Sequence, residues 1–117
     1  MYRAHELGKE GEIEAEQYLI SKGYRIIEKN FSCKRGEIDI VALEKNELVF
    51  CEVKTRTSIE YGLPSEAVTK KKLEHILKTA EFYLYTRNLE KEFVRIDVIE
   101  IYANRQKNRI NHIKQVI

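Results

Sequence analysis

Two acidic residues and a lysine stand in apolar stretches where charged side chains are uncommon. Asp39 lies in Gly-Glu-Ile-Asp-Ile-Val-Ala-Leu (36–43), and Glu52 and Lys54 lie in Leu-Val-Phe-Cys-Glu-Val-Lys-Thr-Arg (48–56). Charged residues are depleted from β-strands, so their presence here needs a physical explanation. Two neighbouring carboxylates can bind Mg²⁺, which prefers oxygen ligands. A nearby ammonium can then orient or help activate the attacking water and stabilise developing negative charge.

A β-hairpin built from the two segments would bring these side chains to one face. The turn at residues 44–47 allows a loop of two or four residues, and both lengths give the same register. In that register Asp39 is directly opposite Glu52, and Glu37 is opposite Lys54. A three-residue loop would shift the register by one and remove this opposition. Like charges in direct opposition destabilise a sheet, and a divalent cation between them would remove the repulsion.

The same residues also fit a purely structural role. In that interpretation Glu52 and Lys54 are exposed strand residues, and a backbone donor satisfies the Asp39 carboxylate. The opposite face of the hairpin is apolar in either case and is expected to be buried against a helix. Its residues are Ile38, Ile40, Ala42, Val49, Cys51 and Val53.

Glu12 is a candidate third carboxylate. In a helix over residues 3–22, Glu12 lies about 40° from the stripe of small residues at 100° per residue, so it borders the side that faces the sheet. A solvated helix edge fits the same spacing equally well. Spacing alone leaves both interpretations open.

The elements that would position these residues follow an α/β pattern. The helix over 3–22 has an inner stripe that includes Gly8 and Gly11. Glycine costs a helix about 1 kcal/mol relative to alanine, so this stripe predicts a close backbone approach to the neighbouring element. Strands are expected at 24–29, 36–43, 48–56, 93–102 and 112–117, with a loop at 30–35 and a second helix from Thr69 to Asn88. The order predicts a single domain, residues 1–117, with a mixed central β-sheet and a helix packed on each side.

Composition excludes several classes of protein. The 117 residues include 21 Lys and Arg against 19 Asp and Glu, and the net charge of +2 argues against a nucleic-acid binder that works by bulk charge. No segment approaches the ~18 uncharged apolar residues of a membrane span, and the N-terminus lacks an apolar core. We therefore expect no membrane partner and a cytoplasmic location.

The charged motifs resemble those of a known enzyme superfamily. Glu37-Ile38-Asp39 followed by Glu52-Val53-Lys54 resembles the signature of the PD-(D/E)xK nucleases. More narrowly, the chain resembles the YraN-like bacterial family of small endonuclease-related proteins. The matching stretches are residues 8–12 with Ala15 and Leu19, 23–24, Asn30, 36–39, 49–56, 67–69 with Lys72, and 95–98, which together cover nearly the whole chain.

This resemblance implies a fold and a site. It implies a restriction-endonuclease-like core and kinship with archaeal Holliday-junction resolvases, in which a glutamate on the first helix joins the hairpin acids. Glu12 matches that glutamate. By the same resemblance Asp39 and Glu52 would be metal ligands with the backbone carbonyl of Val53, and Lys54 would be the catalytic lysine.

Two basic residues are candidate nucleic-acid contacts. Lys72 matches a lysine of the family and closes a run of three lysines in the first turn of the second helix, where the helix dipole disfavours cations. A solvated run of lysines is the commoner reason for such a pattern. Arg56, just past the hairpin strand, is the second candidate phosphate contact.

The residues and the resemblance together predict a Mg²⁺- or Mn²⁺-dependent endonuclease that hydrolyses phosphodiester bonds in DNA. Branched or flapped structures are candidate substrates, and resolvase kinship is compatible with a homodimer. Two alternatives on the same fold are a non-catalytic nucleic-acid-binding module and a dimeric protein-interaction protein.

Overall fold

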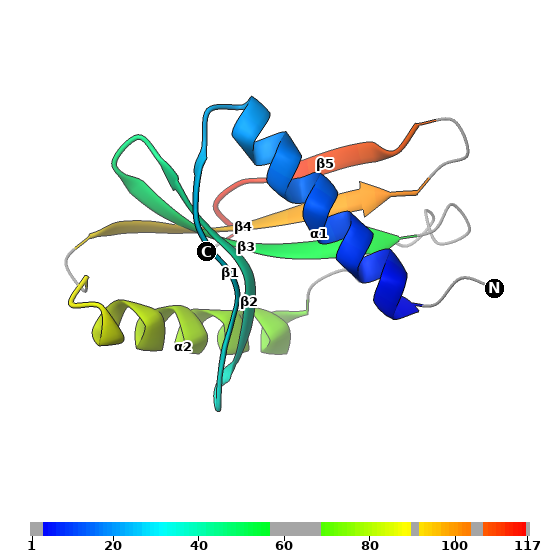
Figure 1. Cartoon of the computed structure of the whole chain (residues 1–117). Helices are drawn as coiled ribbons and strands as arrows, with labels where there is room; N and C mark the ends of the chain where they lie inside the picture. Colours follow the sequence, from blue (N-terminus) through cyan, green and yellow to red (C-terminus); the bar gives the residue numbers. More distant parts are fainter. Residues whose placement is uncertain (1–3, 57–68, 90–91, 104–106, 117) are drawn as a thin grey trace.

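The chain forms a mixed α/β fold in a computed structural model that describes residues 4–56, 69–89, 92–103 and 107–116 (Figure 1). One five-stranded sheet has the order β1-β2-β3-β4-β5. Among the strands in these described ranges, only β3 and β4 pair in parallel, and the other neighbours are antiparallel. The elements are α1 (Ala4–Ser21), β1 (Arg25–Cys33), β2 (Gly36–Glu44), β3 (Glu47–Arg56), α2 (Lys70–Thr86), β4 (Phe93–Tyr102) and β5 (Arg109–Ile113).

The order of elements agrees with the sequence-based prediction, but two boundaries differ. The loop expected at 30–35 is wrong for residues 30–33, which continue β1 in register with β2 through the pair Phe31↔Ile38. Phe31 also packs edge-on against Tyr83 of α2, with ring centroids 5.1 Å apart. This packing accounts for the longer strand. The last strand lies earlier than expected, at 109–113 instead of 112–117. Residues 67–68 of the family motif lie outside the described residues.

Side chains of β3 alternate between two apolar clusters. Val49 and Cys51 pack with residues of α1, and Leu48 and Phe50 pack with residues of α2. The prediction that Ile38 shares the face of Ile40 is wrong. The α1 cluster contains Ala15, Leu19, Tyr24, Ile40, Ala42, Val49, Cys51, Ile99 and Ile101, and the α2 cluster contains Ile38, Val41, Leu48, Phe50, Ile76, Ala80, Tyr83, Leu84 and Ile96. Ile38 belongs to the α2 cluster with Val41, whereas Ile40 belongs to the α1 cluster.

Of the two glycines on the inner stripe of α1, only Gly11 makes the predicted close approach to the sheet. A Cβ added at Gly11 would overlap the Thr55 hydroxyl of β3, whereas a Cβ at Gly8 would meet nothing within 4 Å. The expectation for Gly8 is therefore wrong. A straight helix that crosses a twisted sheet makes its closest contact over a short length, and that length is at Gly11.

Gly11→Ala is expected to lower the free energy of unfolding by about 1–3 kcal/mol, because the new methyl group overpacks the contact with Thr55. Gly8→Ala is the matched control, and it should raise the stability by up to about 1 kcal/mol through helix propensity alone. Urea unfolding measures both. Adding Thr55→Ala to Gly11→Ala removes the nearest atom and should recover part of the loss. Equal effects of the two glycine substitutions would contradict the close approach.

Candidate active site

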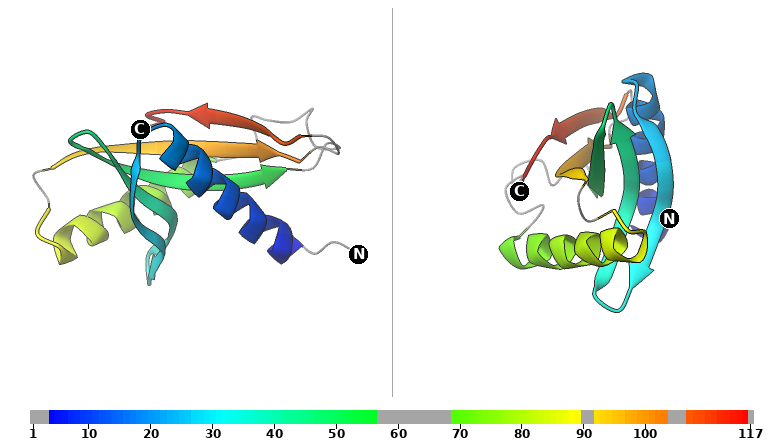
Figure 2. Two further views of the ribbon diagram at one scale, coloured as in Figure 1. Left: turned by 45° about the horizontal axis from the view of Figure 1, so that its top comes forward. Right: turned by 90° about the vertical axis from the view of Figure 1, so that its left-hand side faces the viewer.

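The β2–β3 hairpin has the predicted register, but only up to Ile40↔Cys51. Its pairs include Leu43↔Leu48 and Val41↔Phe50, and they meet at a two-residue turn. Beyond Ile40 the strands separate, so Asp39 and Glu52 are not a cross-strand pair and the predicted direct opposition is wrong. From that point β2 stays paired with β1, and β3 stays paired with β4. Figure 2 shows the β1–β2 hairpin leaving the rest of the sheet beside α2.

Asp39 stands where the two strands separate, and its carboxylate takes over a backbone hydrogen bond. Asp39 Oδ2 accepts from the Val53 amide at 2.8 Å. The separation of β2 removes the strand partner that this amide would otherwise have, and buried backbone donors are nearly always paired. The structural interpretation is therefore confirmed for the backbone donor of Asp39, but it is wrong for Glu52, which it expected to be exposed and which is buried. A carboxylate has about four acceptor positions, so this bond leaves capacity for a cation.

Asp39 and Glu52 form a buried acidic pair, each with 8% of its surface exposed. Burial raises the pKa of Asp39, although the hydrogen bond from Val53 acts against it. Burial and the charge of Asp39 raise the pKa of Glu52 to about 7. A hydrogen bond between the two carboxyl groups raises the pKa of Glu52 further and lowers that of Asp39. Without a cation, the site therefore resists holding two negative charges at neutral pH.

Glu12 of α1 approaches this pair from the helix side. Partial burial, followed by the charges of Asp39 and Glu37, raises the pKa of Glu12. Glu12 directly follows Gly11, where α1 comes closest to β3. The tight helix contact thus places a third carboxylate near Asp39, as the spacing on the helix allowed.

The donor set suits a hard cation that keeps part of its water. Within the described ranges, no group of three His, Cys, Asp or Glu side chains is arranged to hold a metal ion by itself. Mg²⁺ commonly binds through one or two carboxylates and fills its remaining positions with water and phosphate oxygens. Asp39, Glu52 and the backbone carbonyl of Val53 fit that mode of binding.

Two lysines lie on the solvent side of the acidic pair. Lys54 is exposed and follows Glu52 by two residues, which places both on one face of β3. Lys72 comes from the first turn of α2, and its Nζ lies 3.4 Å from Glu52 Oε2. Thr69 is the N-cap of α2, as predicted.

Arg56 differs from these lysines because it is buried. Its Nε lies 3.8 Å from Glu100 Oε2, and its side chain is 8% exposed. This arrangement does not present the guanidinium to solvent, and a phosphate contact at Arg56 stays a prediction. Glu100 was not identified from the sequence. It is buried on β4 and accepts hydrogen bonds from Tyr102 and Asn111 at 3.1 and 2.9 Å.

A second buried network is centred on Asp97 of β4, which had no role in the sequence-based prediction. Asp97 accepts from Arg95 Nε at 2.9 Å and from the Gln115 amide at 2.9 Å, and His112 Nε2 lies 2.7 Å from its Oδ2. Burial opposes the ionisation of Asp97, but the hydrogen bonds from His112 and Arg95 outweigh it and keep its pKa below the ordinary value. His112 Nδ1 lies 3.0 Å from the Tyr18 hydroxyl, which links β5 to α1. In the sequence, Asp97 was marked only by its place in an apolar strand and in the family-matching stretch 95–98.

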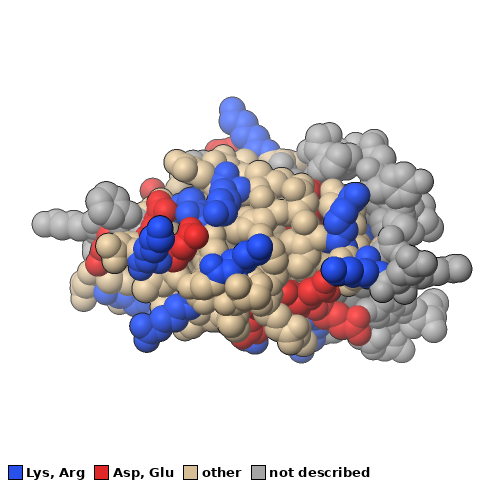
Figure 3. All heavy atoms as spheres, turned by 90° about the horizontal axis from the view of Figure 1, so that it is seen from above, with Lys and Arg blue, Asp and Glu red and all other residues tan. Residues whose placement is uncertain are grey.

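Figure 3 shows one further face of the surface, on which the charged side chains are dispersed. On the face seen from above Figure 1, lysine and arginine side chains stand apart on a largely uncharged surface, with acidic side chains near its ends. We therefore place no nucleic-acid contact on this face.

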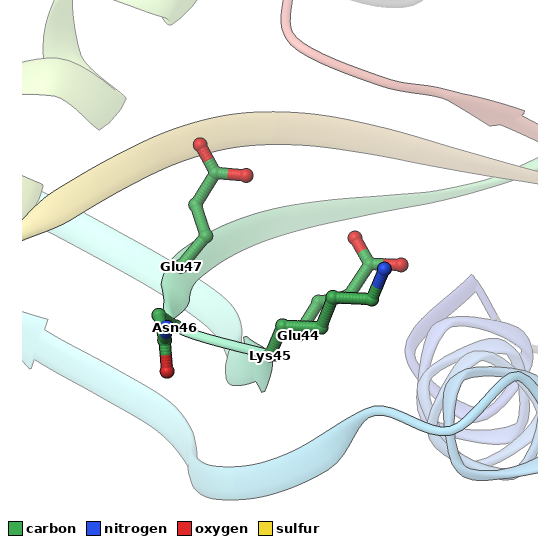
Figure 4. A pocket seen from close by; sticks show the side chains of 4 residues that line it. All are labelled: Glu44, Lys45, Asn46 and Glu47. Atoms are coloured by element: carbon green, nitrogen blue, oxygen red, sulfur yellow. The ribbon is translucent and has the colours of Figure 1, made fainter.

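A hollow of about 380 Å³ lies at the opposite end of the hairpin from the acidic pair (Figure 4). Turn residues Glu44, Lys45, Asn46 and Glu47 line it. Glu44 and Glu47 also accept hydrogen bonds from Arg95 Nη1 at 2.9 and 3.1 Å. These two carboxylates therefore belong to the hydrogen-bond network of Arg95. The hollow is separate from the candidate active site.

The described helices include none with the length and apolar composition that crossing a membrane requires.

Comparison with known proteins matches the chain to a family without an assigned activity. The model of the uncharacterised protein family UPF0102 matches residues 11–101. A UPF0102 protein of Caldanaerobacter subterraneus subsp. tengcongensis is 52% identical over 110 residues, which cover 92% of this chain and 90% of the relative. A UPF0102 protein of Clostridioides difficile is 46% identical over 108 residues, covering 92% and 93%. A third, of Persephonella marina, is 46% identical over 107 residues, covering 92% and 89%.

Proposed function

The chain belongs to the UPF0102 family, the YraN-like family that its motifs predicted, and we propose that it is a divalent-metal-dependent nuclease that hydrolyses phosphodiester bonds in DNA. The observation that carries the proposal is the buried pair Asp39 and Glu52 at the separation of β2 from β3. Two adjacent buried carboxylates oppose folding unless something compensates their charge. A backbone donor explains why position 39 holds an acceptor, but it does not explain a second carboxylate beside it.

The roles of the chain's own residues follow from their positions. Asp39, Glu52 and the Val53 carbonyl would hold Mg²⁺ or Mn²⁺. Such an ion lowers the pKa of bound water and polarises a phosphoryl oxygen. Lys54, exposed beside Glu52, would orient the water and stabilise the negative charge that develops on the phosphate. Glu12, which lies near Asp39, would add a third carboxylate to the site.

The proposal includes a restriction-endonuclease-like core with one helix on each side of the sheet. Two features support it. The sheet is mixed, with a single parallel pair, β3 and β4, connected through α2. The two helices also belong to different apolar clusters, and the side chains of β3 alternate between those clusters.

The proposed substrate is a polymer, because lysines from separate elements flank the acidic pair. Lys54 lies on β3, and Lys72 lies on α2. Two cations on one side of a metal site suit successive phosphates of a nucleic-acid chain better than a single small anion. A branched or flapped substrate, a homodimer and a cytoplasmic location belong to the proposal through the family resemblance. Sedimentation of the purified protein tests the dimer.

A cleavage assay tests the proposed reaction. The protein is incubated with single-stranded, duplex and four-way-junction DNA in Mg²⁺, Mn²⁺ or EDTA. We expect cleavage of at least one substrate with either metal and none in EDTA. Lys54→Ala should slow cleavage by about 10²-fold or more, because it removes a charge that acts in the transition state. Lys45→Ala is the matched control, since this exposed lysine lies in the hairpin turn at the far end, and it should cut at the wild-type rate.

Two results would refute the nuclease. One is the absence of cleavage on every substrate with both metals, and the other is a Lys54→Ala variant that cuts as fast as the wild type. Salt-sensitive DNA binding without any metal requirement would then favour the non-catalytic binding module.

A further inference from the structure

The ammonium of Lys72 lies against one of the two carboxylates that would hold the metal. Its Nζ is 3.4 Å from Glu52 Oε2, on a side chain that is about half exposed, whereas Glu52 is buried. Burial raises the pKa of both Asp39 and Glu52, and the charge of Lys72 acts in the opposite direction on each. In the metal-free protein, the positive charge of Lys72 therefore compensates part of the negative charge of Asp39 and Glu52. A bound cation would compensate the same negative charge.

The backbone of Lys72 is fixed, and its side chain is free to reorient. The Thr69 hydroxyl accepts from the Lys72 amide at 3.1 Å and caps α2. Leu73 and Ile76 pack in the α2 cluster and hold the helix against the sheet. The lysine side chain itself is a flexible four-carbon stem that carries a compact charge. Lys72 can thus exchange Glu52 for another anion without moving the helix.

We propose that Lys72 is an internal counterion of Glu52, that a divalent cation displaces it, and that the released ammonium then binds a phosphate of the nucleic acid. This inference rests on the proposed function and adds a coupling between its two ligands. The 3.4 Å contact between Lys72 and Glu52 is a weak ion pair, because the lysine side chain is half exposed. A divalent cation that coordinates the Glu52 carboxylate oxygens would therefore displace the lysine. After displacement, the ammonium is left in a helix turn that contains no acidic residue. By linkage, metal and nucleic acid then each raise the affinity for the other by the same factor.

The first test measures the affinity of the metal-free protein for Mn²⁺ by calorimetry. Lys72→Met removes the competing ammonium, so Mn²⁺ should bind about 3- to 5-fold more tightly than to the wild type, as expected for loss of one weak, half-exposed ion pair. Lys71→Met is the matched control, because it removes the same charge from the same exposed helix turn, and its affinity should stay within about twofold of the wild type. Lys72→Arg keeps the counterion and should also stay within about twofold.

The outcomes separate this inference from the proposed function. If neither the wild type nor Lys72→Met binds Mn²⁺, the metal site of the proposed function is refuted together with this inference. If the wild type binds Mn²⁺ and Lys72→Met binds it equally well, only the inference is overturned. The same holds if Lys71→Met tightens binding as much as Lys72→Met.

The second test measures the coupling itself. Affinity for four-way-junction DNA is determined by fluorescence anisotropy in EDTA and in Ca²⁺. Ca²⁺ should strengthen DNA binding more for the wild type than for Lys72→Met, by about the factor found with Mn²⁺. Equal strengthening in the two proteins would overturn the transfer of Lys72 to phosphate.

Discussion

Asp39→Asn is expected to abolish DNA cleavage while leaving a protein at least as stable as the wild type. Asparagine has the shape of aspartate, and its side-chain oxygen can still accept from the Val53 amide, so the separation of β2 from β3 is preserved. It removes one of the two carboxylates that would hold the metal. A metal ion supplies several kcal/mol of transition-state stabilisation, so the cleavage rate should fall by about 10³-fold or more.

The gain in stability should depend on pH. Burial raises the pKa of Asp39 and, with the charge of Asp39, raises that of Glu52 from 4.5 to about 7. Because both folded-state pKa values lie above the unfolded ones, the wild type loses stability as pH rises through this window. Asp39→Asn removes one of the two charges. Its advantage over the wild type should therefore grow between pH 5 and pH 8, to roughly 1–2 kcal/mol.

Urea unfolding in EDTA at the two pH values measures this difference. Glu37→Gln is the control, because Glu37 is an exposed acid that also acts on Asp39, and its advantage should be smaller. An Asp39→Asn protein that cuts DNA at the wild-type rate would contradict the catalytic role. A variant whose stability relative to the wild type fell between pH 5 and pH 8 would contradict the repulsion within the acidic pair.

Asp97→Asn is expected to lower the free energy of unfolding by about 3–5 kcal/mol, the range for breaking a buried ion pair by removing one partner. Asp97 is fully buried, and its two oxygens accept from Arg95, His112 and the Gln115 amide. Asparagine offers one acceptor oxygen in place of two and no charge. Arg95, itself buried, would then keep its hydrogen bond to the Tyr24 hydroxyl, but only the more exposed Glu44 and Glu47 would balance its charge.

Glu47→Gln is the matched control for this network. Glu47 also accepts from Arg95, but its side chain is 38% exposed, so its loss should cost at most about 1 kcal/mol. Urea unfolding at pH 7 compares the two variants. A loss below 1 kcal/mol for Asp97→Asn would show that the network contributes little to stability.

The hairpin shows how far the sequence could predict the site. The length of the turn and the alternation of side chains along the strands predicted five residue pairs correctly, from Glu44↔Glu47 to Ile40↔Cys51. The separation beyond Ile40 could not be predicted, because it depends on a third strand. Phe31 keeps β1 paired with β2 by packing on Tyr83, and Phe31 lay in a segment that the pattern assigned to a loop.

Other residues escaped prediction because their partners are distant in sequence. The Asp97 network joins β4 to His112 and, through it, to Tyr18 on the first helix. A strand pattern identifies such an aspartate as unusual but does not identify its partners. Helical periodicity placed Gly8 and Gly11 on the same stripe, and only the crossing of α1 over β3 distinguishes them.

The hydrogen bond between Asp39 and Val53 has a consequence for how the family diverges. Folding requires an acceptor at position 39 and gains nothing from a charge there, so a lineage released from the reaction could accumulate asparagine without harm. A large apolar residue at position 39 would leave the Val53 amide without its hydrogen-bond acceptor. Such a residue should therefore be rare at this position in any member of the family. If the proposed reaction is correct, aspartate against asparagine at position 39 should therefore separate relatives still under selection for it from those that keep only the fold.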